Sequence, residues 1–230
     1  MEMLVSACVF FLGLHFVVSG TPVRDIIVRT TGEAAFAAGF AILAGAGLVW
    51  MIVAYGSAPR VELWHLPTTL TPLFLALNLI ACIFIVAGLT VRNPTAIGRI
   101  KALNDPDVAS GFLRITRHPM NCGIALFCLV HVLENGQTAS LVLFGSILAL
   151  AALGPRSIDA KRKQAHGEAW DKFAAVTSHL PFAAIVEGRN SFKIGELGWW
   201  RIALGVVLFA ALFYLHEHVS GVALGLPFVS

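Results

Sequence analysis

The sequence predicts an all-α fold: a polytopic helix bundle of about six transmembrane helices embedded in a membrane. Three observations lead to this prediction. Of the 230 residues, 57% are hydrophobic and only 13% are charged, whereas about a quarter of the residues of a soluble domain are charged. The charged residues lie between long apolar runs, and nearly all Lys and Arg residues fall in alternate gaps between those runs. This composition excludes both a water-soluble globule and a disordered chain.

The apolar runs define the helices. A helix that crosses a bilayer needs about 20 mostly apolar residues, because its backbone polar groups must be satisfied within the segment. Four runs approach or meet this length and carry no charge away from their ends, at residues 3–20, 34–55, 70–91 and 199–215. Two shorter uncharged runs, 119–133 and 138–154, flank the turn signal Glu134-Asn135-Gly136, so we expect them to form a helical hairpin.

The first run could be mistaken for a cleaved signal peptide, since it ends in Val18-Ser19-Gly20, which resembles a small-residue cleavage site. Its start carries Glu2 and neither Lys nor Arg, which is unlike the basic start of a signal peptide. We therefore expect this run to remain in the protein as a helix, within a single transmembrane domain over 1–230.

The basic residues predict the orientation. Loops 92–118 and 155–198, the segment after the first run and the basic start of the last run contain every Lys and Arg except Arg60. Cytoplasmic loops of membrane proteins carry this excess. The sequence therefore predicts a multi-pass protein of the inner (cytoplasmic) membrane, with both termini outside, on the periplasmic side. The net charge of +3 then indicates contact with anionic membrane lipids, and no nucleic-acid-binding motif is present.

Residues 158–176 alternate charged residues with Trp170 and Phe173. This pattern predicts a cytoplasmic amphipathic helix whose aromatic edge lies at the inner membrane face. A solvated loop helix is the alternative.

Two histidines, His15 and His131, lie inside predicted spans. An imidazole in hydrocarbon is costly, so we expect each ring either to hydrogen-bond to another helix or to ligate a cofactor. Both helices are otherwise apolar and offer aromatic neighbours, as an iron porphyrin held by axial nitrogen ligands requires. Cys128 precedes His131 by three residues and so shares its helix face. Its thiol is therefore a candidate neighbour or alternative ligand of the iron.

The strongest local signature is Arg114-Ile115-Thr116-Arg117-His118-Pro119, followed by Gly123 and by Phe127-Cys128-Leu129-Val130-His131. Gly167-Glu168-Ala169-Trp170 and Thr177-Ser178-His179-Leu180-Pro181-Phe182 follow downstream. In these motifs, and over nearly its whole length, the chain resembles the NnrU family. That family includes bacterial membrane proteins associated with denitrification and the 15-cis-zeta-carotene isomerases.

The resemblance implies a haem b protein. The isomerase branch uses reduced haem iron to assist rotation about a cis double bond of a polyene, and its two His ligands match His15 and His131. Its candidate alternative thiolate matches Cys128, which we take as the candidate catalytic residue. Arg117 and His118 are further candidate cofactor-binding residues. The implied partners are membrane lipids, a lipophilic small-molecule substrate, or a respiratory nitrite and nitric oxide reductase system.

Two other functions stay open. The Arg117-His118-Pro119 motif also resembles that of integral-membrane methyltransferases, which bind S-adenosylmethionine on the cytoplasmic side. There, an acidic pair is expected where this chain has Asp159-Ala160. A non-enzymatic haem sensor or an assembly factor for respiratory reductases is the second alternative. The motif also has a purely structural interpretation, with Pro119 in the first turn of a helix and Arg117 at the lipid headgroups.

Overall fold

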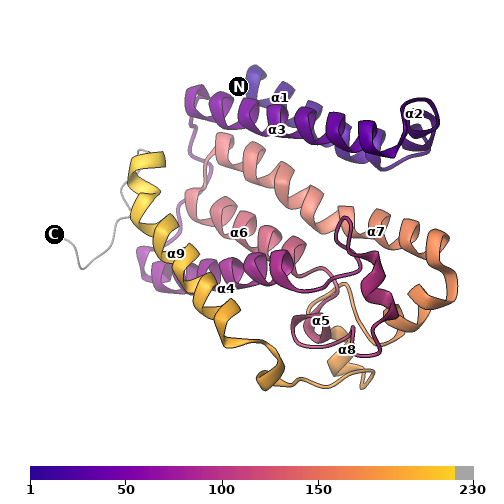
Figure 1. Cartoon of the computed structure of the whole chain (residues 1–230). Coiled ribbons are helices and arrows are strands. Elements are labelled where there is room, and N and C mark those ends of the chain that lie inside the picture. The colour runs from indigo at the N-terminus through magenta and orange to yellow at the C-terminus, as the bar shows by residue number, and fades with distance from the viewer. Residues whose placement is uncertain (221–230) are drawn as a thin grey trace. The chain divides into compact units, whose positions relative to one another are not determined.

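The computed structural model describes residues 1–220, with side chains through residue 216. As predicted, the described chain is helical and contains no strand beyond one isolated bridge between Glu62 and Gln137. It divides into two compact units, residues 1–66 with 131–157 and residues 67–130 with 158 onward. Figure 1 shows the helices of both, coloured along the chain.

The first unit is built from the N-terminal helices and part of the helical hairpin. Its elements are α1 (Glu2–Gly13), the π-helical turn η1 (Leu14–Ser19), α2 (Val23–Thr31), α3 (Glu33–Ser57), the end of α6 (Pro119–Asn135) and the first half of α7 (Thr138–Ala175). The sequence predicted neither the π-helical turn nor the short helix α2.

The core of the first unit joins α1, α3 and α7. Its buried residues are Leu4, Ala7, Cys8, Phe11, Met51, Ala54, Ala139 and Leu143. Two polar contacts fix the same helices to one another. The Tyr55 hydroxyl lies 2.9 Å from the Ser140 hydroxyl, and the Cys8 thiol donates to the Val142 carbonyl at 3.7 Å. The first unit is therefore held by packed apolar side chains with few hydrogen bonds between helices.

The second unit contains the remaining elements. They are η2 (Thr68–Leu70), α4 (Thr71–Thr90), η3 (Ile100–Asn104), α5 (Phe112–Ile115), most of α6, the second half of α7, α8 (Ala183–Val186), η4 (Ile194–Glu196) and α9 (Trp199–Ser220). Glycines allow helices to approach closely: a Cβ on Gly88 would lie 2.4 Å from the Met120 nitrogen, and one on Gly205 would lie 2.6 Å from Ile83 Cα. Small residues at helix contacts are typical of membrane proteins.

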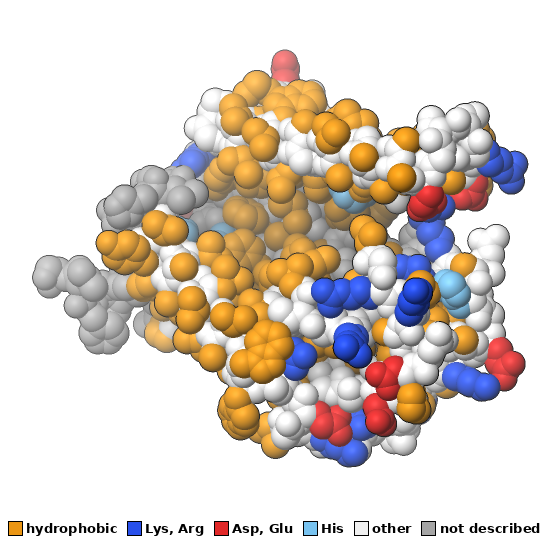
Figure 2. All heavy atoms as spheres, in the orientation of Figure 1, with side chains coloured by type: hydrophobic (Ala, Val, Ile, Leu, Met, Phe, Trp, Pro, Cys, Tyr) orange, Lys and Arg blue, Asp and Glu red, His pale blue; other side chains and the backbone are white. Residues whose placement is uncertain are grey.

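Within the described residues 1–220, five helices are long and apolar enough to cross a membrane, and they correspond to five of the six predicted spans. They cover Glu2–Ser19, Glu33–Ser57, Thr68–Thr90, Thr138–Ala175 and Trp199–His216. The remaining predicted span is α6, which has 17 residues, one fewer than the shortest of these five. Figure 2 shows hydrophobic side chains over α1 and α3, and charged side chains gathered over the part of the second unit near α5 and α8.

The prediction for residues 158–176 is wrong in one respect. These residues are helical, but they continue directly from the span as part of α7, and a kink at the non-helical Gly167 (φ 46°, ψ −119°) separates their last turns from the rest of that helix. Trp170 and Phe173 are 2% and 3% exposed and pack in a core with Leu113. The aromatic edge is thus covered by the protein's own chain, rather than lying at the membrane face.

An ion pair ties the start of α5 to the segment before α9. Arg114 Nε lies 2.7 Å from Glu196 Oε2, which also accepts the Gly111 N–H at 3.1 Å. The hydrogen bonds from Arg114 and then from Gly111 lower the pKa of Glu196 from 4.5 to about 2. The carboxylate therefore stays ionised at any pH near neutrality.

The predicted hairpin turn is confirmed. α6 ends at Asn135 and α7 begins at Thr138, and the Gly136 carbonyl between them accepts the N–H groups of Leu63 and Trp64 at 2.7 and 3.2 Å. Gly136 has φ +58°, and a Cβ there would lie 1.9 Å from the Trp64 carbonyl oxygen.

We expect Gly136→Ala to lower the free energy of unfolding by more than the ~1–2 kcal/mol of a left-handed residue alone, because a steric clash adds to the backbone strain. Gly98→Ala is the matched control, since Gly98 has φ +73° with no atom within 4 Å of an added Cβ. Denaturant titration of the two variants in detergent measures the difference. Equal losses would mean that the contact with Trp64 contributes nothing.

Candidate functional site

His15 lies in the π-helical turn η1 of the first unit. Its Nδ1 lies 2.8 Å from the Phe11 carbonyl oxygen. Because a carbonyl only accepts, Nδ1 is the protonated nitrogen, and in the neutral ring Nε2 carries the lone pair. Ligating histidines are oriented in this way, with one ring N–H donated to a carbonyl or carboxylate. The ring also contacts Phe11 and Phe40, with centroids 4.4 and 5.1 Å away.

The π-helical turn sets the direction of His15. Such turns are rare and often mark functional sites, because the extra residue per turn rotates the side chains that follow. The turn ends at Gly20, where an added Cβ would lie 2.2 Å from the Phe16 carbonyl oxygen. Gly20 is therefore required by the local backbone path.

We expect Gly20→Ala to destabilise the protein by about 1–3 kcal/mol, the usual cost of an overpacked site. Gly13→Ala, in the same segment, should be neutral or slightly stabilising, because nothing lies within 4 Å of its added Cβ. Thermal unfolding of both variants in detergent would test this. A Gly20→Ala protein as stable as the Gly13→Ala protein would contradict the prediction.

His131 lies on α6, in the part of that helix that belongs to the first unit. Its ring packs on Phe144 of α7, with centroids 4.7 Å apart. Phe144 packs against the core of the first unit, to which Phe11, the partner of His15, also belongs. Each predicted ligand is thus half-buried and contacts an aromatic side chain that belongs to, or packs against, the core of the first unit.

Among residues 1–220, no group of three or more His, Cys, Asp or Glu side chains could hold an ion. The two imidazoles lie beside phenylalanines, and one of them has a fixed tautomer. Imidazole nitrogens in apolar surroundings are ligands that an iron porphyrin takes.

Cys128, the predicted catalytic residue, is assigned to the second unit, three residues before His131 on α6. Its side chain is 2% exposed and forms no disulfide. Arg117 and His118, the other predicted cofactor-binding residues, also belong to the second unit.

Arg117 and His118 share one partner, Asp159 of α7. The Nε and Nη2 atoms of Arg117 lie 2.8 and 2.6 Å from Asp159 Oδ2, and His118 Nε2 lies 2.7 Å from Oδ1. The side chains of Arg117, His118 and Asp159 are 15%, 0% and 19% exposed. The carboxylate orients the imidazole, as it does in many proton-transfer sites. Nδ1 of His118 is buried and lacks a hydrogen-bond partner within the described chain.

The backbone around this cluster is fixed by the segment that follows α7. The Arg117 N–H donates to the Ser178 carbonyl at 2.9 Å, and the Thr116 hydroxyl donates to the His179 carbonyl at 2.8 Å. Pro119 then begins α6, as the structural interpretation of the motif predicted. Arg117, however, is directed to a carboxylate within the protein.

The sequence did not identify Asp159 as the partner of the Arg-His pair. Asp159 is 42 positions from Arg117 and 41 from His118, and the sequence related it to this motif only through the resemblance to methyltransferases, without predicting the contact. A signal was present: Asp159 is an acidic residue in a strongly basic segment.

Comparison with known proteins agrees with the resemblance. Residues 3–224 match the family described as NnrU protein. Two curated relatives are both named 15-cis-zeta-carotene isomerase, chloroplastic. The protein from Zea mays is 34% identical over 81 residues, and the protein from Arabidopsis thaliana is 36% identical over 81 residues.

Each of these alignments covers 35% of this chain and 22% of the relative. The chain is therefore similar to less than a quarter of either isomerase. No solved structure matches it significantly.

Proposed function

The chain belongs to the NnrU family, and from that premise we propose that it is an integral membrane protein that binds haem b through His15 and His131. The hydrogen bond from His15 Nδ1 to the Phe11 carbonyl supports this proposal most directly. It directs the Nε2 lone pair away from the backbone and prevents the ring from rotating. The aromatic side chains around both rings would exclude water from the bound group.

We further propose that the reaction is cis–trans isomerisation of a polyene such as 15-cis-zeta-carotene. The activity for which the two relatives are named supports this, as do the phenylalanine side chains that contact the two histidines, which suit a lipophilic substrate. The bound haem would supply an iron that acts as a Lewis acid or an electron donor. The chain's own groups hold and orient it, and the position of Cys128 on the helix of His131 makes its thiol the candidate for a direct chemical role.

The absorption spectrum of the detergent-purified protein tests haem binding. We expect a Soret band and the visible bands of a low-spin, bis-histidine haem b. A folded but colourless preparation, purified from cells with adequate haem supply, would rule out this proposal.

Expression in cells that accumulate the cis isomer of zeta-carotene tests the reaction. We expect the pigment profile to shift toward the trans isomer. If the protein contains haem but leaves the pigment profile unchanged, haem binding would stand and isomerisation would be ruled out. This result would then favour the alternative role in denitrification and nitric oxide metabolism, as a sensor or an assembly factor for the respiratory reductases.

Methyl transfer remains the alternative suggested by Arg117-His118-Pro119. Titration calorimetry with S-adenosylmethionine distinguishes it, because neither isomerisation nor haem binding needs that ligand. Measurable binding that is lost in Arg117→Gln would support a methyltransferase.

We propose the inner membrane as the location, with loops 92–118 and 155–198 in the cytoplasm and both termini in the periplasm. The excess of Lys and Arg in these loops supports this orientation. Alkaline phosphatase fused after residue 66, between two spans, should be active, and a fusion after residue 98 should be inactive. The reverse pattern would contradict the orientation.

A further inference from the structure

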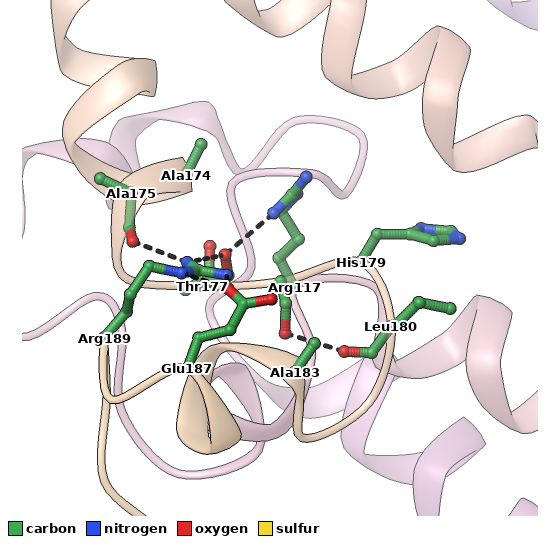
Figure 3. A pocket seen from close by; sticks show the side chains of 10 residues that line it. Arg117, Ala174, Ala175, Thr177, His179, Leu180, Ala183, Glu187 and Arg189 are labelled. Atoms are coloured by element: carbon green, nitrogen blue, oxygen red, sulfur yellow. Dashed lines mark hydrogen bonds and ion pairs between the residues drawn. The ribbon is translucent and has the colours of Figure 1, made fainter.

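The second unit has an open hollow of about 540 Å³ beside the Arg117–Asp159 pair. Three segments of the second unit line it: Arg117 itself, residues 174–180 at and after the end of α7, and residues 183–189 at and after α8. Figure 3 shows the side chains of Arg117 and Arg189 coming from different segments, with the Glu187 carboxylate beside Arg189 and Leu180 to one side.

Two guanidinium groups converge in this hollow. Nη1 of Arg117 and Nη1 of Arg189 lie 3.1 and 3.0 Å from the same atom, the Thr177 carbonyl oxygen. A carbonyl carries only a partial negative charge, so the repulsion between two like charges is incompletely offset there. An anion placed beside both groups would be bound by charge-assisted hydrogen bonds, which are the strong class.

The Glu187 carboxylate already pairs with one of the two guanidinium groups, that of Arg189. Both Nε and Nη2 of Arg189 lie 2.6 Å from Glu187 Oε2. The Glu187 side chain is 56% exposed, and exposed ion pairs contribute only about 0–1 kcal/mol. Asp159, by contrast, is 19% exposed and holds Arg117 from the buried side. A stronger acceptor can therefore displace Glu187 while the Arg117–Asp159 pair stays intact.

One part of the rim of the hollow is apolar. Leu180 lines it and is 66% exposed, and Ala174, Ala175 and Ala183 are the other apolar residues of the lining. A hollow with two cations and an exposed apolar rim, in a protein with five candidate spans, matches a molecule that has an anionic head and a hydrocarbon chain. Basic pockets of membrane proteins bind lipid headgroups in this way.

We propose that this hollow is a binding site for the phosphate headgroup of an amphiphile, such as an anionic lipid, with Arg189 and Arg117 as the phosphate-binding side chains. In this site Glu187 competes with the phosphate for Arg189, and the apolar rim at Leu180 contacts the first part of the hydrocarbon chain. The site is independent of haem and of the two histidines.

Native mass spectrometry of the full chain in dodecyl maltoside tests the proposal, with dioctanoyl phosphatidic acid as the probe. We expect one saturable site, and at least tenfold weaker binding of dioctanoyl phosphatidylcholine and of inorganic phosphate. Arg189→Gln should weaken binding about tenfold, since it removes charge-assisted hydrogen bonds. Glu187→Gln should strengthen it about threefold, because it removes a competing exposed carboxylate.

Lys163→Gln is the matched control. It removes one positive charge from the second unit, at a side chain that is 66% exposed and pairs with Asp171, and it should leave the affinity unchanged. Arg189 also donates to the carbonyls of Ala175 and Thr177, so its replacement could perturb the loop. Glu187→Gln leaves these backbone contacts in place. If the Arg189 variant does not fold, the affinity of Glu187→Gln for phosphatidic acid tests the proposal.

Three results would overturn the proposal. The first is that Arg189→Gln and Lys163→Gln bind the probe equally. The second is that Glu187→Gln binds it no more tightly than the wild type. The third is that inorganic phosphate binds as tightly as phosphatidic acid, which would assign the hollow to a soluble phosphate.

Discussion

His15→Ala and His131→Ala are each expected to abolish the haem absorbance of the purified protein. The proposed site offers one imidazole on each of two helices, and loss of either removes an axial ligand from an apolar slot in which water is a poor replacement. The Soret absorbance relative to the protein absorbance at 280 nm measures haem occupancy. The expected change is from near-stoichiometric haem to little or none.

His65→Ala is the control for this experiment. His65 belongs to the first unit and its side chain is 77% exposed, so its loss should leave the spectrum unchanged. Circular dichroism would confirm that the variants remain helical. Full haem occupancy in both the His15 and the His131 variants would show that the ligands lie elsewhere in the chain.

Asp159→Asn is expected to have the largest effect on stability. It removes the only carboxylate shown to accept from both Arg117 and His118, and it leaves a guanidinium that is 15% exposed without a counter-charge. Breaking one side of a buried ion pair costs about 3–5 kcal/mol. Denaturant unfolding of the detergent-solubilised protein would measure this loss.

Two comparisons make the result specific to the buried cluster. Asp171→Asn breaks an ion pair with Lys163 in which both side chains are more than half exposed, and we expect a loss below about 1 kcal/mol. Asp159→Leu combined with Arg117→Met should recover part of the stability, because no charge is left unpaired. An Asp159→Asn protein as stable as the Asp171→Asn protein would mean that the cluster is not a stabilising element.

The helices could be predicted closely because a single physical constraint governs them. A segment in hydrocarbon must be apolar, helical and about 20 residues long, so run length alone located α3 at Glu33–Ser57 against a predicted 34–55. The turn between α6 and α7 followed from the Asn-Gly signal at 135–136. The two histidines were visible for the same reason, since polar groups are conspicuous in an apolar run.

Features that depend on what covers a residue could not be predicted. The alternation at Trp170 and Phe173 reveals an apolar edge, but the edge packs on Leu113, some 60 residues earlier in the sequence. The π-helical turn at Leu14–Ser19 lies in a run that is apolar apart from His15 and Ser19, so the spacing of its residues leaves no periodic pattern in hydropathy. The sequence placed Asp159 at the position of an acidic pair in one alternative function, but only its contacts show that it pairs with Arg117 and His118.

Tolerance to substitution should differ sharply between positions of α9, the last described helix. Only 6% of the apolar stretch of α9 is buried within the protein, so most of its side chains can exchange one hydrocarbon group for another over evolutionary time. At Gly205, where the backbone of α4 leaves no room for a Cβ, even a methyl group forces the helices apart. A comprehensive substitution scan should therefore find α9 permissive to apolar changes along almost its whole length, with a sharply intolerant point at Gly205.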